Sequence, residues 1–134
     1  MANAAVTWRS CRQDNISLST AVAELIALTE GTKEGLWILD ILDHLGFKLK
    51  KFLAYCDNTA TIVIAKNPQN HSSTKHVEIK ALYCREIYEK GKLEIKYCKS
   101  KDMIADIFTK ALPRSQFEKL RQLMGLHDLS KQHK

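Results

Sequence analysis

The feature that most restricts the fold of this sequence is a short apolar run, Phe52–Cys56, which ends directly at Asp57. A continuous apolar run of this length is typical of a strand buried on both faces, as in α/β proteins. Open α/β sheets bind their ligands at the carboxyl ends of the strands, which is where Asp57 lies. Asp57 and Asn58 are also good caps for a following helix, so both interpretations of the aspartate stay open.

A long helix is predicted before this strand. It begins near Ser19 or Thr20, both favourable N-caps, and ends at Gly46. Gly31 and Gly35 weaken its middle, where a kink is expected. Its apolar positions keep helical spacing: Val22, Leu25, Ile26, Trp37, Ile38, Ile41, Leu42 and Leu45.

Further elements alternate along the chain. The run 59–65 is rich in β-branched residues, but its Asx start favours a helix, and Pro68–Ser72 reads as a loop. A helix over 73–90, capped by Ser73, precedes the half-exposed strand Leu93–Tyr97. Asp102 is predicted to cap a short helix that carries Asp106, and Ser115-x-x-Glu118 is a capping box for the last helix.

The N-terminal segment Ala4–Ser10 alternates like a strand and is followed by a polar turn at 12–15. Strands alternating with helices predict an α/β fold. A chain of 134 residues is long enough for one domain with its own core, predicted over 4–126, with a polar tail at 127–134.

Composition narrows the class of protein. Lys and Arg number 21 against 15 Asp and Glu, giving a net charge of +6, which favours a polyanionic partner. The four cysteines lack zinc-ligand spacing, so buried reduced thiols are expected, as at Cys56. The N-terminus has no signal-peptide pattern, and no apolar stretch approaches the ~20 residues of a membrane span. We therefore expect an intracellular protein, cytoplasmic or nuclear, without a membrane partner.

Three acidic residues form the candidate site: Glu24 early in the long helix, Asp57 at the strand end, and Asp106 near the C-terminus. Each has an ordinary explanation: a glutamate favourable to the helix dipole, a helix cap, and a solvent-exposed or capping aspartate. Together, carboxylates from two helices and a strand end suit metal-assisted phosphodiester cleavage.

Six ordered motifs carry a family resemblance: Thr7-Trp8-Arg9-Ser10, Leu18–Leu28 with its Ala23-Glu24-Leu25 core, Tyr55-Cys56-Asp57-Asn58, Ala65-Lys66-Asn67-Pro68, Thr74-Lys75-His76 and Ala105–Pro113. From about Ala4 to Leu126 the chain resembles the RNase H domain at the C-terminus of copia-type LTR-retrotransposon Pol polyproteins.

The resemblance implies a ribonuclease H-like α/β fold, a mixed sheet reduced here to about three strands with flanking helices. It also implies a hydrolase, an endonuclease that cleaves the RNA strand of an RNA–DNA hybrid with Mg²⁺ or Mn²⁺. Glu24, Asp57 and Asp106 match the second, third and fourth acidic ligands of the family. Carboxylate oxygens are the ligands that Mg²⁺ prefers.

Two departures from the family pattern matter. Its domain begins with a hairpin whose first strand carries the first acidic ligand, whereas this chain starts at the family's third strand. Asp14, in the following turn, is a poor substitute, and Val22 replaces a usual glutamate. Activity of this chain is therefore expected to be weak or absent. In the family's strand order 3-2-1-4-5, segment Ala4–Ser10 loses its neighbour and must pair with Phe52–Cys56, detach or pair with another molecule. An incomplete sheet edge favours a homo-oligomer.

Substrate contacts are expected from Lys75, His76, Lys99 and Lys101, since lysine–phosphate contacts give salt-dependent binding; each lysine could equally be an ordinary solvated side chain. Three functions remain open: a nuclease domain, a catalytically inactive nucleic-acid-binding remnant of a retroelement, and a structural, dimerising domain that packs against a reverse transcriptase.

Overall fold

The computed structural model describes residues 4–10, 19–67 and 75–127. Contacts divide the chain into two units, residues 13–98 and residues 1–12 with 99–134, and each unit is considered by itself. The predicted turn at 12–15, the loop at 68–72, the cap at Ser73 and the tail beyond residue 127 lie outside the described residues.

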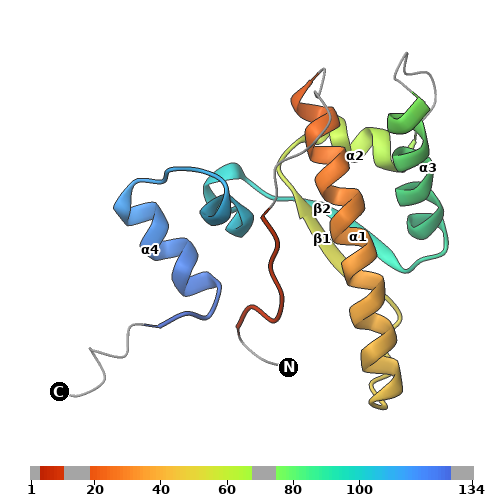
Figure 1. Ribbon diagram of the computed structural model, residues 1–134, viewed down its shortest axis with the longest axis horizontal. Helices are drawn as coiled ribbons and strands as arrows, with labels where there is room; N and C mark the ends of the chain where they lie inside the picture. Colours follow the sequence, from red (N-terminus) through yellow and green to blue (C-terminus); the bar gives the residue numbers. More distant parts are fainter. Residues whose placement is uncertain (1–3, 11–18, 68–74, 128–134) are drawn as a thin grey trace. The chain divides into compact units, whose positions relative to one another are not determined.

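The unit of residues 13–98 has α/β organisation, as the sequence predicts (Figure 1). Its elements are α1 (Thr20–His44), β1 (Phe52–Cys56), α2 (Thr59–Lys66), α3 (Lys75–Glu89) and β2 (Leu93–Tyr97). The two strands pair in parallel, with Phe52 opposite Leu93 and Cys56 opposite Tyr97. A parallel pair needs a crossover connection, which α2 and α3 provide. Within the described residues the sheet therefore has two strands, both parallel, instead of the expected mixed sheet of about three.

Helix α1 has the predicted boundaries. The Ser19 side chain accepts a hydrogen bond from Val22 N at 3.3 Å, which satisfies one unpaired donor of the first turn. Gly46 follows the helix at a φ of 89°, a conformation that glycine adopts without strain. The helix continues through Gly35, where the absent side chain makes room for the Phe52 ring: a Cβ would lie 2.5 Å from it. This glycine thus serves close packing of α1 on β1.

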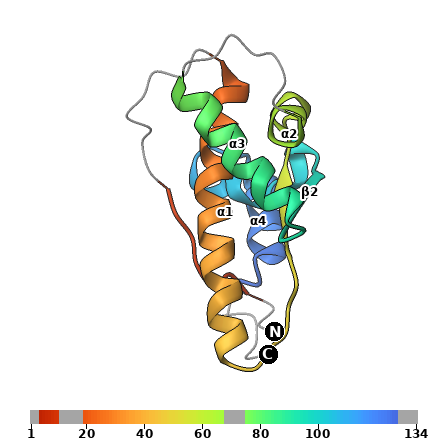
Figure 2. The ribbon, with the colours of Figure 1, turned by 90° about the vertical axis from the view of Figure 1, so that its right-hand side faces the viewer.

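The core lies between α1, α3 and the inner face of the sheet. Figure 2 shows α1 and α3 side by side, and the two helices are in contact along their packed faces. Leu25 and Cys84 are fully buried there, together with Leu93 and Ile95 of β2. On β1 the side chains alternate: Cys56 is buried, whereas Leu53 and Tyr55 are exposed on the other face. One face of the strand is therefore solvated, and the expected burial of both faces was wrong.

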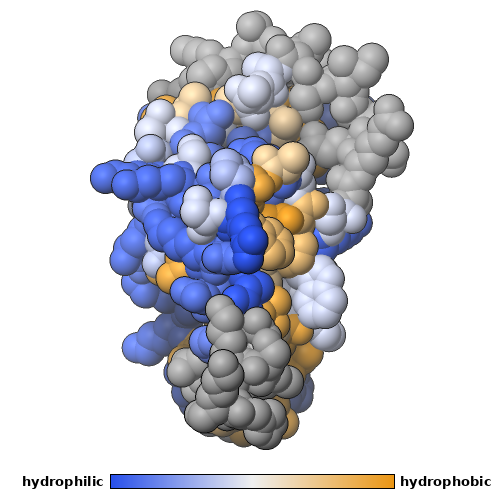
Figure 3. All heavy atoms as spheres, turned by 90° about the vertical axis from the view of Figure 1, so that its left-hand side faces the viewer, coloured by the Kyte–Doolittle hydropathy of each residue, from blue (hydrophilic) through white to orange (hydrophobic). Residues whose placement is uncertain are grey.

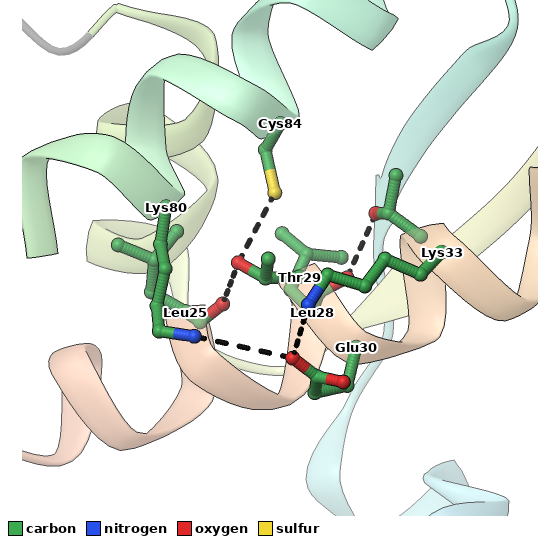
Figure 4. A network of polar contacts seen from close by, with 8 residues as sticks. Leu25, Leu28, Thr29, Glu30, Lys33, Lys80 and Cys84 are labelled. Carbon is green, nitrogen blue, oxygen red and sulfur yellow. Dashed lines mark hydrogen bonds and ion pairs between the residues drawn. The ribbon is translucent and has the colours of Figure 1, made fainter. Parts of the chain in front are cut away.

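Buried hydroxyls of the α1–α3 interface bond to their own helix (Figure 4). Thr29 Oγ1 donates to Leu25 O at 2.7 Å and lies 3.5 Å from Cys84 Sγ on α3. Thr32 Oγ1 donates to Leu28 O at 2.7 Å in the same way. Among the described residues, no buried side-chain polar atom lacks a hydrogen-bond partner. Threonine can therefore occupy this core without an unsatisfied group.

The β-branched run after β1 is a helix, as predicted from its Asx start. Asn58 is the N-cap of α2, and its side chain accepts a hydrogen bond from Thr61 N at 3.2 Å. Thr61 Oγ1 in turn donates to Ala21 O at 3.0 Å. This contact ties the first turn of α2 to the first turn of α1.

The other unit contains the short 3₁₀ helices η1 (Ser100–Asp102) and η2 (Ile104–Phe108) and the helix α4 (Arg114–Leu123). Residues 4–10 form no strand, so that prediction was wrong. Their backbone bonds to the C-terminal segment instead, with Ala5 N donating to Met124 O at 3.0 Å. Ser10 Oγ donates to Phe108 O at 3.3 Å. The segment was expected to pair with β1, to detach or to pair with another molecule. In the structure it belongs to the C-terminal unit and does not pair with β1.

Two predicted caps in this unit were also wrong. Helix α4 begins at Arg114 after Pro113, two residues earlier than a Ser115 cap requires. Glu118 consequently pairs with Arg114 at 2.9 Å and does not close a capping box. Asp102 ends η1 and pairs with Lys119, while Met103 occupies the N-cap position of η2.

Helix α4 is amphipathic: Leu120 is fully buried, whereas Arg114 is almost fully exposed. Figure 3, with α4 toward the viewer, shows hydrophilic residues beside a band of hydrophobic ones. The buried Leu120 marks the apolar side with which α4 packs on its own unit. Among the residues that the structure describes, no helix is long and apolar enough to cross a membrane.

Candidate functional site

Asp57 lies where the polypeptide leaves the carboxyl end of β1 and enters α2. It follows Cys56, the last strand residue, and its side chain is half-buried. Asn58, not Asp57, caps the helix. Helix capping, the ordinary explanation of this aspartate, is therefore excluded, and its carboxylate remains available at the strand end, where α/β sheets bind ligands.

Glu24 lies in the second turn of α1. The first turn contains no acidic residue, so the interpretation of Glu24 as a first-turn glutamate favourable to the helix dipole was wrong. The Thr61–Ala21 hydrogen bond fixes the preceding turn to the start of α2. This hydrogen bond therefore joins α1 close to Glu24 and α2 close to Asp57.

The pKa of the Cys56 thiol is raised by its surroundings. Burial is the main cause that raises the pKa of Cys56, and a hydrogen bond to Asn58 O partly offsets it. The negative charges of Glu24 and Asp57 raise the pKa further. Both carboxylates therefore lie within electrostatic reach of Sγ. Glu24 and Asp57 are thus the two predicted acids whose charges act on one thiol in the unit of residues 13–98.

Asp106 lies on η2 in the other unit. The expected alternative of a solvent-exposed aspartate was wrong, because Asp106 is 8% exposed. Its carboxylate pairs with Lys110 Nζ at 2.9 Å. A buried carboxylate needs such a partner, so the ion pair alone is a sufficient structural reason for its position.

The chemistry of the side chains decides which of them could hold a metal ion. Glu24 and Asp57 offer hard carboxylate oxygens that fit Mg²⁺ or Mn²⁺. Cys56 does not fit that role, because its raised pKa keeps the thiol protonated at neutral pH. Within either unit, the described residues contain no group of three or more His, Cys, Asp and Glu that could hold a metal ion. The assignment of Glu24, Asp57 and Asp106 as joint ligands stays a prediction.

The predicted substrate-binding residues are exposed and divided between the units. Lys75 and His76 begin α3, whereas Lys99 precedes η1 and Lys101 lies within it. All four side chains are open to solvent, as phosphate contacts require. Exposure is equally what an ordinary solvated lysine shows, so it does not separate the two interpretations.

Tyr97 is a residue at this site that the sequence pattern did not single out. It lies opposite Cys56 at the carboxyl end of β2 and is 54% exposed. Alternation alone places it on the same side as the buried Leu93 and Ile95. Tyr97 differs from the buried Leu93 and Ile95 in being the last residue of the strand, and this position is the sequence signal for its exposure.

The structure is an α/β fold with an aspartate at the carboxyl end of a parallel strand, which is compatible with a ribonuclease H-like fold. The sequence is 36% identical, over 92% of its length, to the retrovirus-related Pol polyprotein from transposon TNT 1-94 of Nicotiana tabacum. It is 30% and 29% identical, over 90% of its length, to those from transposons RE1 and RE2 of Arabidopsis thaliana. The chain is thus a homologue of one segment of retrotransposon Pol polyproteins.

The chain spans 8–9% of the length of these relatives. No family model matches the sequence, and no solved structure matches it. The comparisons therefore establish a retroelement relationship without identifying which activity of a polyprotein the matching segment carries.

Proposed function

We propose that the chain is a ribonuclease H-like domain of a retroelement Pol polyprotein, and that its chemistry is metal-dependent hydrolysis of the RNA strand of an RNA–DNA hybrid. One observation carries the proposal. Asp57 lies half-buried directly after the carboxyl end of the parallel strand β1, and Asn58, not Asp57, caps the helix that follows. Ordered acidic residues at a strand end, in a homologue of Pol polyproteins, favour a nuclease over other α/β functions.

The proposed roles of the residues follow from their chemistry. Glu24 and Asp57 would hold the divalent ion with carboxylate oxygens, and Asp106 would join them from η2. A bound Mg²⁺ or Mn²⁺ supplies an activated hydroxide and stabilises the leaving 3′ oxygen. For Asp106 to take this role, its carboxylate must exchange the ion pair with Lys110 for the metal.

Binding of the hybrid is proposed to depend on cations that contact phosphates. The net charge of +6 supplies attraction without sequence specificity. Lys75 and His76 at the start of α3, and Lys99 and Lys101 near η1, are the proposed contacts. Because such contacts release counterions, affinity is expected to fall steeply as salt rises.

A second candidate is an inactive nucleic-acid-binding or structural remnant of a retroelement. The observation that favours it is that neither unit by itself gathers three metal-binding side chains among the described residues. In this alternative the chain binds hybrids, or packs on a reverse transcriptase domain, without cleaving. Two carboxylates could still bind one ion weakly, while a two-ion clamp needs ligands that bridge ions ~3.5–4 Å apart.

The deciding experiment is a cleavage assay on an RNA–DNA hybrid labelled on each strand in turn, with Mg²⁺, with Mn²⁺ and with chelator. The proposal expects slow, metal-dependent cleavage of the RNA strand that falls to background in Asp57→Asn and Glu24→Gln. Asp40→Asn, a matched change at an exposed position late in α1, should retain activity. Salt-sensitive binding without cleavage would support the inactive remnant, and no binding would support a purely structural role.

The binding contacts can be tested separately. Lys75→Glu should weaken hybrid binding more than Lys131→Glu, which makes the same charge change in the polar C-terminal sequence. Equal effects would mean that general charge, and not the start of α3, determines affinity. An affinity that does not change with salt would exclude a nucleic-acid partner.

A further inference from the structure

We propose that Tyr97, the last residue of β2, contacts a ribose of the RNA strand in a bound RNA–DNA hybrid. The ring packs on the sugar, and the phenol hydroxyl hydrogen-bonds to the 2′-hydroxyl. Tyr97 thereby lets the chain distinguish RNA from DNA. This inference rests on one part of the proposed function, because it requires the chain to bind hybrids and does not require it to cleave them.

Tyr97 lies beside the candidate site in the parallel strand pair. It is opposite Cys56, and the next residue along β2 donates its N–H to Cys56 O at 3.0 Å. Asp57 directly follows Cys56. Adjacent strands lie about 4.8 Å apart, and one strand of a duplex advances about 3.4 Å along the axis for each nucleotide. A nucleic-acid strand with a phosphate at Asp57 therefore passes Tyr97 within about one or two nucleotides.

The alternation of β2 places Tyr97 on the inner face of the sheet, where the packed core ends. Leu93 and Ile95 precede it on the same face and are 2% and 4% exposed, whereas Tyr97 is 54% exposed. Its ring is thus packed on one part and open to solvent on the other. An apolar ring with a polar tip suits a ligand that offers both a sugar face and hydroxyl groups.

The other tyrosines differ from Tyr97 in their packing or their face of the sheet. Tyr83 and Tyr88 pack against the buried core, and Lys66 Nζ lies 5.3 Å from the centre of the Tyr88 ring. Tyr55 is 57% exposed, but it lies on the outer face of the sheet. Tyr97 is therefore the tyrosine that combines exposure with a position on the inner face at the carboxyl end of a strand.

The phenol hydroxyl is the group that suits Tyr97 to a ribose. RNA differs from DNA by its 2′-hydroxyl, which both donates and accepts hydrogen bonds. A phenol hydroxyl can also do both, whereas an ionised carboxylate at Glu24 or Asp57 can only accept. The Cys56 thiol is 4% exposed. Among these four side chains of the site, Tyr97 is therefore the exposed one that can donate to a ribose.

The first test measures hybrid binding in the presence of chelator, so that metal-dependent cleavage does not contribute. Fluorescence anisotropy of a labelled RNA–DNA hybrid should show a rise of about tenfold in the dissociation constant for Tyr97→Ala, within the range of aromatic contacts to nucleic acid. Tyr55→Ala removes a similarly exposed tyrosine from the other face and should leave the dissociation constant unchanged. Thermal melts followed by circular dichroism check that both variants are folded.

The second test isolates the hydroxyl. Tyr97→Phe keeps the ring, so its affinity for a DNA duplex of the same sequence should equal that of the wild type. Its affinity for the hybrid should fall about fivefold, as expected for the loss of one hydrogen bond. Replacing the riboses of the RNA strand by deoxyribose, one at a time, should reveal a position at which the wild type loses a similar factor. At that position Tyr97→Phe should lose nothing further, because both changes remove the same contact.

Several outcomes would overturn the proposal. Equal losses in Tyr97→Ala and Tyr55→Ala would show a general effect of the surface. Unchanged hybrid affinity in Tyr97→Phe excludes the hydroxyl contact, and so do additive effects at every deoxyribose position. A chain that binds no hybrid refutes this contact together with the binding part of the proposed function. Binding without cleavage refutes the nuclease chemistry alone, and the same measurements on Tyr97 then still decide the contact.

Discussion

Thr61→Val is expected to destabilise the unit of residues 13–98 by removing one specific hydrogen bond. Thr61 is fully buried, and its Oγ1 donates to Ala21 O at 3.0 Å. Valine has nearly the same shape but cannot donate. The change therefore separates the hydrogen bond between α2 and α1 from the packing of the side chain that makes it.

The magnitude follows from what each partner loses. A typical buried hydrogen bond contributes a net of about 0.5–1.5 kcal/mol. Ala21 O lies in the first turn of α1 and keeps its helical acceptor role, so little penalty for an unsatisfied carbonyl is added. Threonine and valine have similar helix propensities. We expect a loss of about 1 kcal/mol, or a fall in Tm of roughly 4–8 °C for a unit of this size.

Urea unfolding followed by circular dichroism measures the loss, with Thr59→Val as the matched control. Thr59 is an exposed residue in the same turn of α2, so the same change in atoms should leave the midpoint almost unaffected. Equal effects of the two substitutions would refute the reasoning, because the buried hydrogen bond would then contribute nothing. A loss above about 3 kcal/mol would show instead that the hydroxyl satisfies more than one buried group.

Two further predictions concern helix α1. Gly35→Ala should destabilise the protein by about 1–3 kcal/mol, because the new Cβ meets the Phe52 ring, whereas Gly31→Ala, with nothing within 4 Å, should stabilise it by about 0.5–1 kcal/mol in the same urea titrations. A destabilised Gly31→Ala or a neutral Gly35→Ala would contradict this packing. The pKa of His44 should lie above its ordinary value, since its ring bonds to Asp40 O and faces the Asp40 carboxylate. This stabilisation is complete below the unfolded-state pKa of about 6.5 and is lost as pH rises through the folded value; an NMR titration midpoint at or below the unfolded value would refute it.

The elements that the sequence predicts correctly are those whose signals are local. Helix α1 has a serine cap, apolar residues at helical spacing and a terminal glycine, and the structure follows all three. Strand β1 and helix α2 are separated correctly because an Asx residue stands between them, even though the residues of α2 favour strands. Local chemistry decides these boundaries, so a single sequence is sufficient to place them.

Prediction from the sequence fails where the local conformation depends on contacts with a distant part of the chain. Segment 4–10 alternates like a strand, but its backbone bonds to residues near the C-terminus, such as Met124, and no local pattern encodes that choice. The capping box at Ser115 fails for a related reason. Pro113 precedes the helix with its φ already fixed, so α4 starts at Arg114, and Glu118 takes the nearer arginine as its partner.

At the candidate site, too, the local sequence leaves open a choice that only the folded structure resolves. Sequence alone leaves Asp57 and Asn58 as equal candidates for the cap of α2, because either side chain can accept the hydrogen bond. The structure assigns it to Asn58, at 3.2 Å from Thr61 N. Asp57 then keeps its carboxylate at the end of the strand, and after burial, which is the main cause, its charge and that of Glu24 raise the pKa of Cys56. The choice of Asn58 as the cap is therefore what leaves the Asp57 carboxylate at the end of the strand, the position where α/β sheets bind ligands.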